Sequence, residues 1–400
     1  MKNCEKENPR WNIFALGVVS FFTDMSSEMV FSLLPTFLLG LPGASTAMLG
    51  FIEGFAEALS YALRAVSGIF SDKFRKRKPF VLAGYALSNV VKPVFAVART
   101  PIDVFTIRVS DRVGKAIRTS PRDALICESV SEKHRGVAFG LHRTMDQAGA
   151  IFGPIIASVV MILLSFTIRD VFYLSLIPGT IALLIILFVV KERAAEFSSE
   201  FQFFEGVKSV LKGNFAKLLI IISIFSLGAF NFYFVLLNAQ EAGIGDSFIP
   251  LVYAVVNVAH TAVAIPAGVL SDRIGKEKVM IFGYAVFLSN MLFFLLPTTG
   301  YLAVIIAVFY GAYLGVVETV QRALIPNFVE PKLRGTAYGI YYLAVGSAFF
   351  VSNVVVGNLW ECFGSSIAST YSLVLSLIAI FAMIIFLTRK HESVLEHVEF

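Results

Sequence analysis

Long apolar runs separated by short polar segments recur along nearly the whole chain. A helix needs about 20 apolar residues to cross a bilayer, and strands cannot bury their edges in lipid. The pattern therefore predicts an all-α membrane protein. Eleven runs carry this signal, at 12–39, 47–70, 80–98, 136–164, 171–190, 215–238, 248–270, 279–297, 301–325, 336–360 and 365–388.

A twelfth span is predicted at 103–126, although "RVSDRVGKAIRTSPRD" at 108–123 is rich in charge. If 103–126 were a loop, the basic loops "KFRKRK" (73–78) and "DRIGKEK" (272–278) would lie on opposite sides of the membrane. Lys and Arg favour the cytoplasmic side, so this arrangement is disfavoured. We predict twelve transmembrane helices in the plasma membrane, with both termini in the cytoplasm.

An internal repeat supports this count. "SGIFSDKFRKRK" (67–78) returns as "AGVLSDRIGKEK" (267–278), and "RGVAFG" (135–140) returns as "RGTAYG" (334–339). The distance along the chain between the two copies of the repeat aligns the charged segment 103–126 with the apolar run 301–325. The repeat predicts two pseudo-symmetric six-helix bundles, at 1–190 and 215–400, joined by a cytoplasmic linker at 191–214.

Composition narrows the functional classes. The chain is 57% hydrophobic and 15% charged, which excludes an ordinary soluble protein. Loop charge explains the net charge of +5, so we expect no nucleic-acid partner. No HExxH, clustered Cys and His, or nucleotide-binding loop occurs, so we expect no enzyme activity, catalytic residue, cofactor or metal site. The first run carries Asp24 and Glu28 and lacks a signal-peptide cleavage site, so we expect it to be retained.

Three motifs resemble those of one known family. They are "GIFSDKFRKRK" (68–78), "RVSDRVGKA" (108–116) and "GAIFGP" (149–154). The chain resembles the major facilitator superfamily of secondary transporters, and most resembles a bacterial and archaeal subgroup of mostly unassigned substrates. The resemblance departs at Asp111 and Arg112, where the family normally carries Gln and Gly.

The resemblance implies alternating access, with the first and fourth spans lining a central cavity and the second and fifth helping to close it. It implies a gating role for loop residues Gly68, Asp72, Asp272 and Arg273. It also makes Gly149, Gly153 and Pro154 similar to a motif of drug/proton antiporters. Close helix packing and a proline kink explain these last residues equally well.

Ionisable side chains near the membrane midplane are the candidate site. A rise of 1.5 Å per residue places Asp24 roughly 18 Å deep, and Glu57, Arg112 and Asp146 at roughly 13 to 15 Å. Such groups pair with one another or line water-filled paths. The candidate proton-coupling and cavity residues are Asp24, Glu28, Glu53, Glu57, Arg108, Asp111, Arg112, Lys115, Arg118, His142 and Asp146.

Two interpretations of these charges stay open. They form either a proton-coupled cluster, led by Asp24, or a static ion-pair network. The cations of the fourth span bind an anionic substrate or only neutralise carboxylates. With Arg64 included, five deep cations face six carboxylates, and this near balance favours neutralisation.

The predicted function is secondary active transport by a monomer, with proton-coupled export of a small organic molecule or drug as the leading hypothesis. Sodium is the alternative coupling ion. An anionic metabolite, or a metal- or iron-related solute, is the alternative substrate. A membrane receptor or embedded enzyme is the alternative class, but no loop is long enough for a receptor's output domain.

Overall fold

A computed structural model describes residues 9–74, 77–131, 134–192, 207, 209–330 and 333–395. The side chains of residues 9–10, 64–74 and 390–395 are not among those described. Most of the predicted linker, 193–206 and 208, lies outside the described residues, as does Cys4.

Every predicted span is helical, and no strand occurs in the described part of the chain. The first half contains α1 (Pro9–Phe31), α2 (Leu34–Leu39), α3 (Thr46–Phe74), α4 (Lys78–Val94), η1 (Phe95–Val97), α5 (Pro101–Glu128), α6 (Arg135–Leu164), α7 (Ile168–Leu174) and α8 (Leu176–Phe188). The second half contains α10 (Gly213–Gly228), α11 (Tyr233–Glu241), η3 (Asp246–Phe248), α12 (Ile249–Ile274), α13 (Lys276–Phe294), α14 (Gly300–Leu324), η4 (Ile325–Asn327), α15 (Arg334–Phe363) and α16 (Ser365–Leu395).

The charged segment is one continuous helix, α5, so the prediction of a helix at 103–126 is confirmed. Thr100 caps its first turn by accepting from the backbone N–H of Asp103, while the Asp103 side chain accepts from the backbone N–H of Thr100. This reciprocal capping box satisfies two backbone groups that would otherwise lack partners. Pro101 occupies the first turn, where proline is tolerated, and Pro121 lies within the helix without ending it.

Ten segments in the described residues are long and apolar enough to cross a membrane. Three of them combine two α-helices, namely α1 with α2, α7 with α8, and α10 with α11. The other two long helices, α3 and α5, have 29 and 28 residues. Each is about 42 Å long, which exceeds the hydrocarbon thickness of a bilayer.

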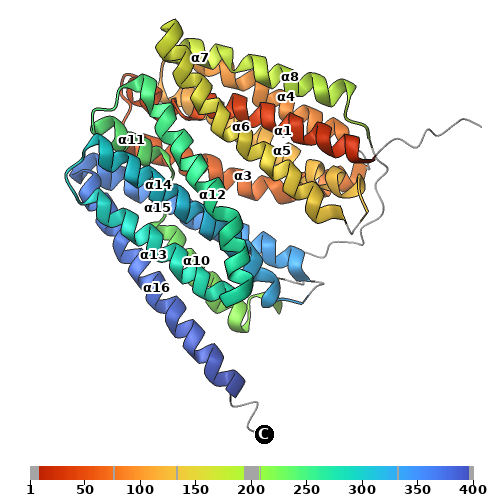
Figure 1. Ribbon diagram of the computed structural model, residues 1–400, viewed down its shortest axis with the longest axis vertical. Coiled ribbons are helices and arrows are strands. Elements are labelled where there is room, and N and C mark those ends of the chain that lie inside the picture. The colour runs from red at the N-terminus through yellow and green to blue at the C-terminus, as the bar shows by residue number, and fades with distance from the viewer. Residues whose placement is uncertain are drawn as a thin grey trace, which may run out of the picture. The chain divides into compact units, whose positions relative to one another are not determined.

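The first compact unit contains Met1–Gly43, Leu59–Ser199 and Asp246–Ala254. In it α1 packs against α6 and α8, and α4 packs against α5 (Figure 1). One apolar cluster joins α1, α4, α5, α6 and α8, and it includes Ile13, Leu16, Val19, Val81, Tyr85, Leu125, Ile126, Ala138, Ala182 and Ile186. A common core of this kind fixes where the polar faces of these helices lie.

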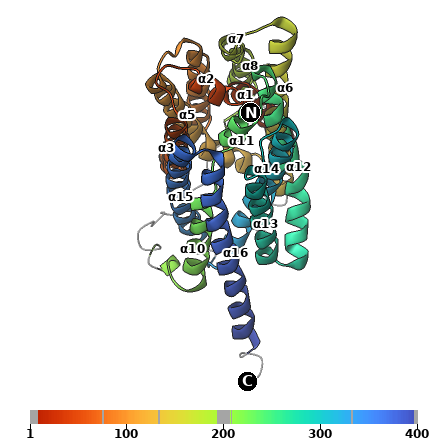
Figure 2. The ribbon, with the colours of Figure 1, turned by 90° about the vertical axis from the view of Figure 1, so that its left-hand side faces the viewer.

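The second compact unit contains Ala44–Ala58, Glu200–Gly245 and Val255–Phe400. Helix α13 packs against α14 and α16, and α10 packs against α15 and α16 (Figure 2). Its interior is aromatic: the Phe225 ring stacks on Tyr284 with centroids 3.8 Å apart, and Phe230 contacts Phe234 and Phe294 edge-on. Phe230 and Phe234 are therefore packing residues, fully buried within this unit.

These units are not the same division as the bundles predicted from the repeat. The first 13 residues of α3, Thr46–Ala58, belong to the second unit, whereas the beginning of α12 belongs to the first. The predicted boundaries at 190 and 215 rest on the repeat and stay a prediction.

Helices α1 and α6 approach closely at the "GAIFGP" motif. A Cβ atom at Gly153 would lie 2.5 Å from the carbonyl oxygen of Met25, and one at Gly149 would collide with the carbonyl oxygen of Phe21. Both glycines therefore permit backbone contact between the two helices. Pro154 follows directly and lies inside α6 without ending it. This close approach agrees with the packing interpretation of the motif, and the role of the motif in transport stays a prediction.

We expect Gly153→Ala to lower the free energy of unfolding by about 1 to 3 kcal/mol, because the new methyl group overpacks the α1–α6 contact. Thermal unfolding of the detergent-solubilised protein measures the effect. The control is Gly140→Ala on the same helix, where a Cβ meets no atom within 4 Å. Equal midpoints for the two variants would contradict the proposed close approach.

Candidate functional site

The candidate site is a group of charged side chains on α1, α5 and α6 of the first unit. Asp24 and Glu28 lie one turn apart on α1, and both feel the charge of Lys115 on α5. Asp146 on α6 interacts with Asp24. The structure therefore brings carboxylates of α1 and α6 together with a cation of α5.

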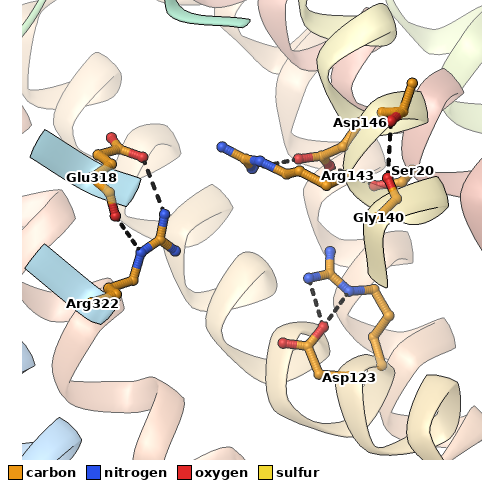
Figure 3. A network of polar contacts seen from close by, with 9 residues as sticks. Ser20, Asp123, Gly140, Arg143, Asp146, Glu318 and Arg322 are labelled. Carbon is orange, nitrogen blue, oxygen red and sulfur yellow. Dashed lines mark hydrogen bonds and ion pairs between the residues drawn. The ribbon is translucent and has the colours of Figure 1, made fainter. Parts of the chain in front are cut away.

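Asp24 and Asp146 form a hydrogen-bonded pair of carboxyl groups. Asp146 also accepts a hydrogen bond of 2.6 Å from the Ser20 hydroxyl and pairs with Arg143 at 2.7 Å (Figure 3). Two carboxyl groups form a hydrogen bond only when one of them carries a proton, because two carboxylates provide acceptors alone. The pair is thus a place on α1 and α6 where two nearby carboxyl groups disfavour a charge on both at once.

Two arginines of α5 lie against the end of α1. The guanidinium groups of Arg108 and Arg112 lie 3.8 and 5.5 Å from the ring centroid of Phe31. Arg108 also pairs with Asp111 at 3.5 Å, and both side chains are almost fully buried. Glu28 feels the charges of Arg112 and Arg108 as well as that of Lys115. Pairing of these cations with carboxylates of α1 stays a prediction.

Arg118 contacts α4 instead. Its guanidinium lies 4.1 Å from the ring centroid of Tyr85, and its Nε and one terminal nitrogen have no hydrogen-bond partner. The side chain is buried. The cations of α5 therefore contact two neighbours, with Arg108 and Arg112 facing α1 and Arg118 facing α4.

A second polar group lies toward the cytoplasmic end of α5 in the predicted topology. Arg122 donates two hydrogen bonds, of 2.8 and 3.0 Å, to the side chain of Asp123 (Figure 3). His142 on α6 is buried, and its Nε2 has no hydrogen-bond partner. The charges that act on it include Arg122 and Asp146. His142 is thus packed beside the carboxyl pair rather than exposed to solvent.

Glu53 and Glu57 lie on the segment Thr46–Ala58 of α3, which belongs to the second unit. Glu53 is buried and accepts a hydrogen bond of 3.5 Å from the Asn231 side chain, while the Asn231 backbone N–H donates to Asn353. Glu57 is half-buried. In the same unit, Glu318 and Arg322 form an ion pair along α14 (Figure 3).

The predicted gating residues are described only in part. The side chains of Gly68 and Asp72 lie outside the described residues. Asp272 is exposed and approaches Lys276 at 3.9 Å, and Arg273 is also exposed. Gly275 has a φ of 100°, which explains a glycine at this position of the loop signature. A gating role for these residues stays a prediction.

Sequence reasoning missed several contributors to this site. Ser20 and Arg143 bind Asp146, and Phe31 lies under two arginines. Lys92 on α4 is fully buried and donates hydrogen bonds to Ser26 and Ser27. A signal for Lys92 existed, since it is an isolated cation within an otherwise apolar run.

Comparison with known proteins assigns this chain to a family. The family model of the Major Facilitator Superfamily matches residues 16–352 and 218–399. An uncharacterized MFS-type transporter of Methanocaldococcus jannaschii is 33% identical over 357 residues, which cover 88% of each chain. The chain belongs to the Major Facilitator Superfamily.

Two further similarities fit this membership. The multidrug resistance protein MdtH of Photorhabdus laumondii is 23% identical over 83% of this chain and 82% of that protein. A crystal structure of a variant of the nucleoside transporter NupG has the same fold, with a TM-score of 0.79, 14% identity, and coverage of 94% of this chain and 99% of that one. The protein is therefore a multi-pass membrane transporter of this superfamily that moves a small molecule, and not an enzyme.

The contact between Arg118 and Tyr85 yields a test with a matched pair of variants. We expect Tyr85→Leu to lower the free energy of unfolding by about 2 kcal/mol, because a buried cation loses the aromatic face beneath it. Tyr85→Phe should stay close to the original protein, since the hydroxyl makes no hydrogen bond. Thermal unfolding in detergent compares the two, and an equal loss in both variants would argue against the cation–π contact.

Proposed function

We propose that this Major Facilitator Superfamily protein is a proton-coupled exporter of a small organic molecule, working by alternating access as a monomer in the plasma membrane. In this proposal α3 and α5 cross the membrane with the ten apolar spans. Twelve spans place both termini in the cytoplasm. Twelve helices in two bundles also fit the repeat and the distribution of basic loops.

The hydrogen-bonded Asp24–Asp146 pair is the observation that carries the proposal. A proton shared by this pair would relieve the repulsion between two carboxylates and hold α1 and α6 together at this point. When that proton leaves, two carboxylates face each other, and the nearby cations Lys115 and Arg143 must redistribute to compensate. A change of one charge in a low-dielectric region thereby biases the packing of two helices, as a transport cycle requires.

Contacts within each compact unit support alternating access. In the second unit, Thr46 at the start of α3 donates two hydrogen bonds, of 2.7 and 2.8 Å, to Glu361 near the end of α15. In the first unit, Ser158 on α6 donates to the backbone of Ser247, just before α12. Each contact joins segments from different repeats at helix ends that the predicted topology places outside. Alternating access requires contacts of this kind, between repeats at one end of the helices, to break and form again during the cycle.

The first support for export of an organic molecule is the similarity of this chain to a multidrug resistance protein. This similarity is distant, at 23% identity. The antiporter-like motif adds a second indication, because Gly149 and Gly153 bring α6 against α1 and so position Asp146 beside Asp24.

We expect an imposed pH gradient to drive ethidium across proteoliposomes that contain the protein, and we expect Asp24→Asn to abolish this drive. An asparagine cannot release a proton, so the pair no longer changes its charge. Ethidium fluorescence reports the drug, and trapped pyranine reports the accompanying proton movement.

The matched control is Asp246→Asn, which alters an exposed carboxylate outside the site. Proton-driven transport of normal rate in Asp24→Asn would refute the assignment of Asp24. A requirement for a sodium gradient in place of the pH gradient would refute proton coupling itself.

An anionic substrate is the second candidate, and the structure strengthens it. Away from the helix ends, the described parts of α1, α5 and α6 carry six cations and five carboxylates. Glu53 and Glu57, which entered the near balance expected from the sequence, belong to the other compact unit. Arg118 keeps two buried nitrogens without hydrogen-bond partners. Guanidinium groups suit carboxylates and phosphates, so an anion would complete this site.

A thermal-shift screen separates the two substrate classes, because a ligand of the folded state raises its unfolding temperature. The organic-molecule hypothesis predicts stabilisation by ethidium and related compounds. The alternative predicts stabilisation by small carboxylates or phosphate esters, with the effect reduced in Arg118→Gln. Stabilisation by anions alone would overturn export of an uncharged or cationic drug.

A further inference from the structure

Lys92 is the most completely buried lysine of the described residues, with no exposed surface. It lies in the last turn of α4, next to Pro93. Its Nζ donates hydrogen bonds to the hydroxyls of Ser26 at 2.6 Å and Ser27 at 3.3 Å, both on α1. The coupling proposed above for Asp24 and Asp146 does not involve this amine.

The hydrogen bonds around Lys92 match a neutral amine. The Ser26 hydroxyl donates its own proton to the carbonyl oxygen of Ser175 at 2.6 Å, so it accepts from Lys92. A neutral amine has two N–H groups, and the two serine hydroxyls accept both. An ammonium group has three, and the third finds no acceptor within hydrogen-bonding distance among the described residues. A buried donor without an acceptor is costly.

The charges around Lys92 come mainly from α5 and α1. On α5, Asp111 attracts a charged Lys92 and Arg118 opposes it. On α1, Asp24 and Glu28 contribute weaker attraction. Arg169 on α7 is directed to the backbone carbonyls of Ala96 and Ala98, Asp170 caps its own helix, and α8 carries no ionisable side chain.

Asp111 is shared between two cations. It pairs with Arg108 at 3.5 Å, and it is also the carboxylate that acts most strongly on Lys92. Arg108 in turn lies over Phe31 and acts on Glu28, next to the carboxyl pair. A shift of Arg108 toward Glu28 would therefore free Asp111 for Lys92. This chain of contacts connects the charge of Lys92 to the site on α1 and α6.

We propose, resting on the proton-coupled transport proposed above, that Lys92 is a second proton-carrying residue of the transport cycle. It is neutral in the conformation described here and becomes charged when Asp111 is released from Arg108. The amine lone pair takes a proton from water, the ammonium group pairs with Asp111, and the proton returns to water in the opposite conformation. A lysine that only ties α4 to α1 would keep one charge state throughout.

The charge state is measured without any substrate. Protein containing ¹⁵N-lysine in lipid vesicles gives separate Nζ resonances for amines and ammonium groups. The resonance that disappears in Lys92→Arg, or in Lys92→Met if the arginine variant does not fold, belongs to Lys92. We expect an amine resonance at pH 9 that converts to ammonium on acidification. An ammonium resonance at every pH between 5 and 9 would overturn the proposal.

Transport separates a proton carrier from a structural lysine. Arginine keeps the charge and donor groups but does not lose its proton, and methionine keeps the length without any proton. In proteoliposomes, both variants should lose ethidium transport driven by a pH gradient at least tenfold, while retaining ethidium exchange at equal pH. The control is Lys78→Arg at the other end of α4, which donates to the Leu187 carbonyl and should behave as the original protein.

Two failures are distinguishable in this experiment. If Lys92→Arg retains transport driven by the pH gradient, Lys92 carries no transported proton, although the function proposed above survives. If the original protein itself shows no response to the pH gradient, the proposed coupling fails. The NMR measurement then still decides whether Lys92 changes its charge.

Discussion

The cost of placing charge in hydrocarbon is the constraint on which the first unit depends. An ionisable group at the membrane centre costs about 2.5 to 3.5 kcal/mol on insertion scales unless it is paired or hydrated. Helix α5 carries a cation on most of its turns, and three of these cations lie against a carboxylate or an aromatic ring. Asp111 pairs with Arg108, Phe31 lies beneath Arg108 and Arg112, and Tyr85 lies beneath Arg118. The helices around α5 are thus held by the need to compensate its charges.

Close packing and proton chemistry coincide where α1 crosses α6. Asp146, Gly149 and Gly153 share one face of α6, following the helical intervals of three and four. The two glycines let the backbones touch, and the same approach brings Asp146 against Asp24 and Ser20. A larger residue at either glycine would separate the carboxyl groups as well as the helices. The motif therefore has one physical role, close approach, with a structural and a chemical consequence.

Lys92 and the carboxyl pair both change their charge by exchanging a proton, but in opposite directions. A neutral carboxyl group becomes charged on losing a proton, and a neutral amine becomes charged on gaining one. Arg108, Asp111 and Glu28 lie between them and connect α1, α4 and α5 electrostatically. If both groups change protonation during transport, the unit conserves its total charge more closely than either group alone would allow. Conserving charge limits the electrostatic cost of each step in a low-dielectric interior.

The sequence by itself determined the class, the helices and the family, because helix length, apolar composition and loop charge are local properties of the chain. Even the charged segment 103–126 was correctly placed as a helix, since the repeat supplied independent information. The helical rise alone predicts that Asp24 and Asp146 lie near the membrane midplane. Tertiary structure decided which side chains meet. Helix rotation and tilt depend on packing against neighbours, so the sequence did not reveal that Arg118 faces Tyr85, that Glu53 binds Asn231, or that the buried Lys92 meets Ser26.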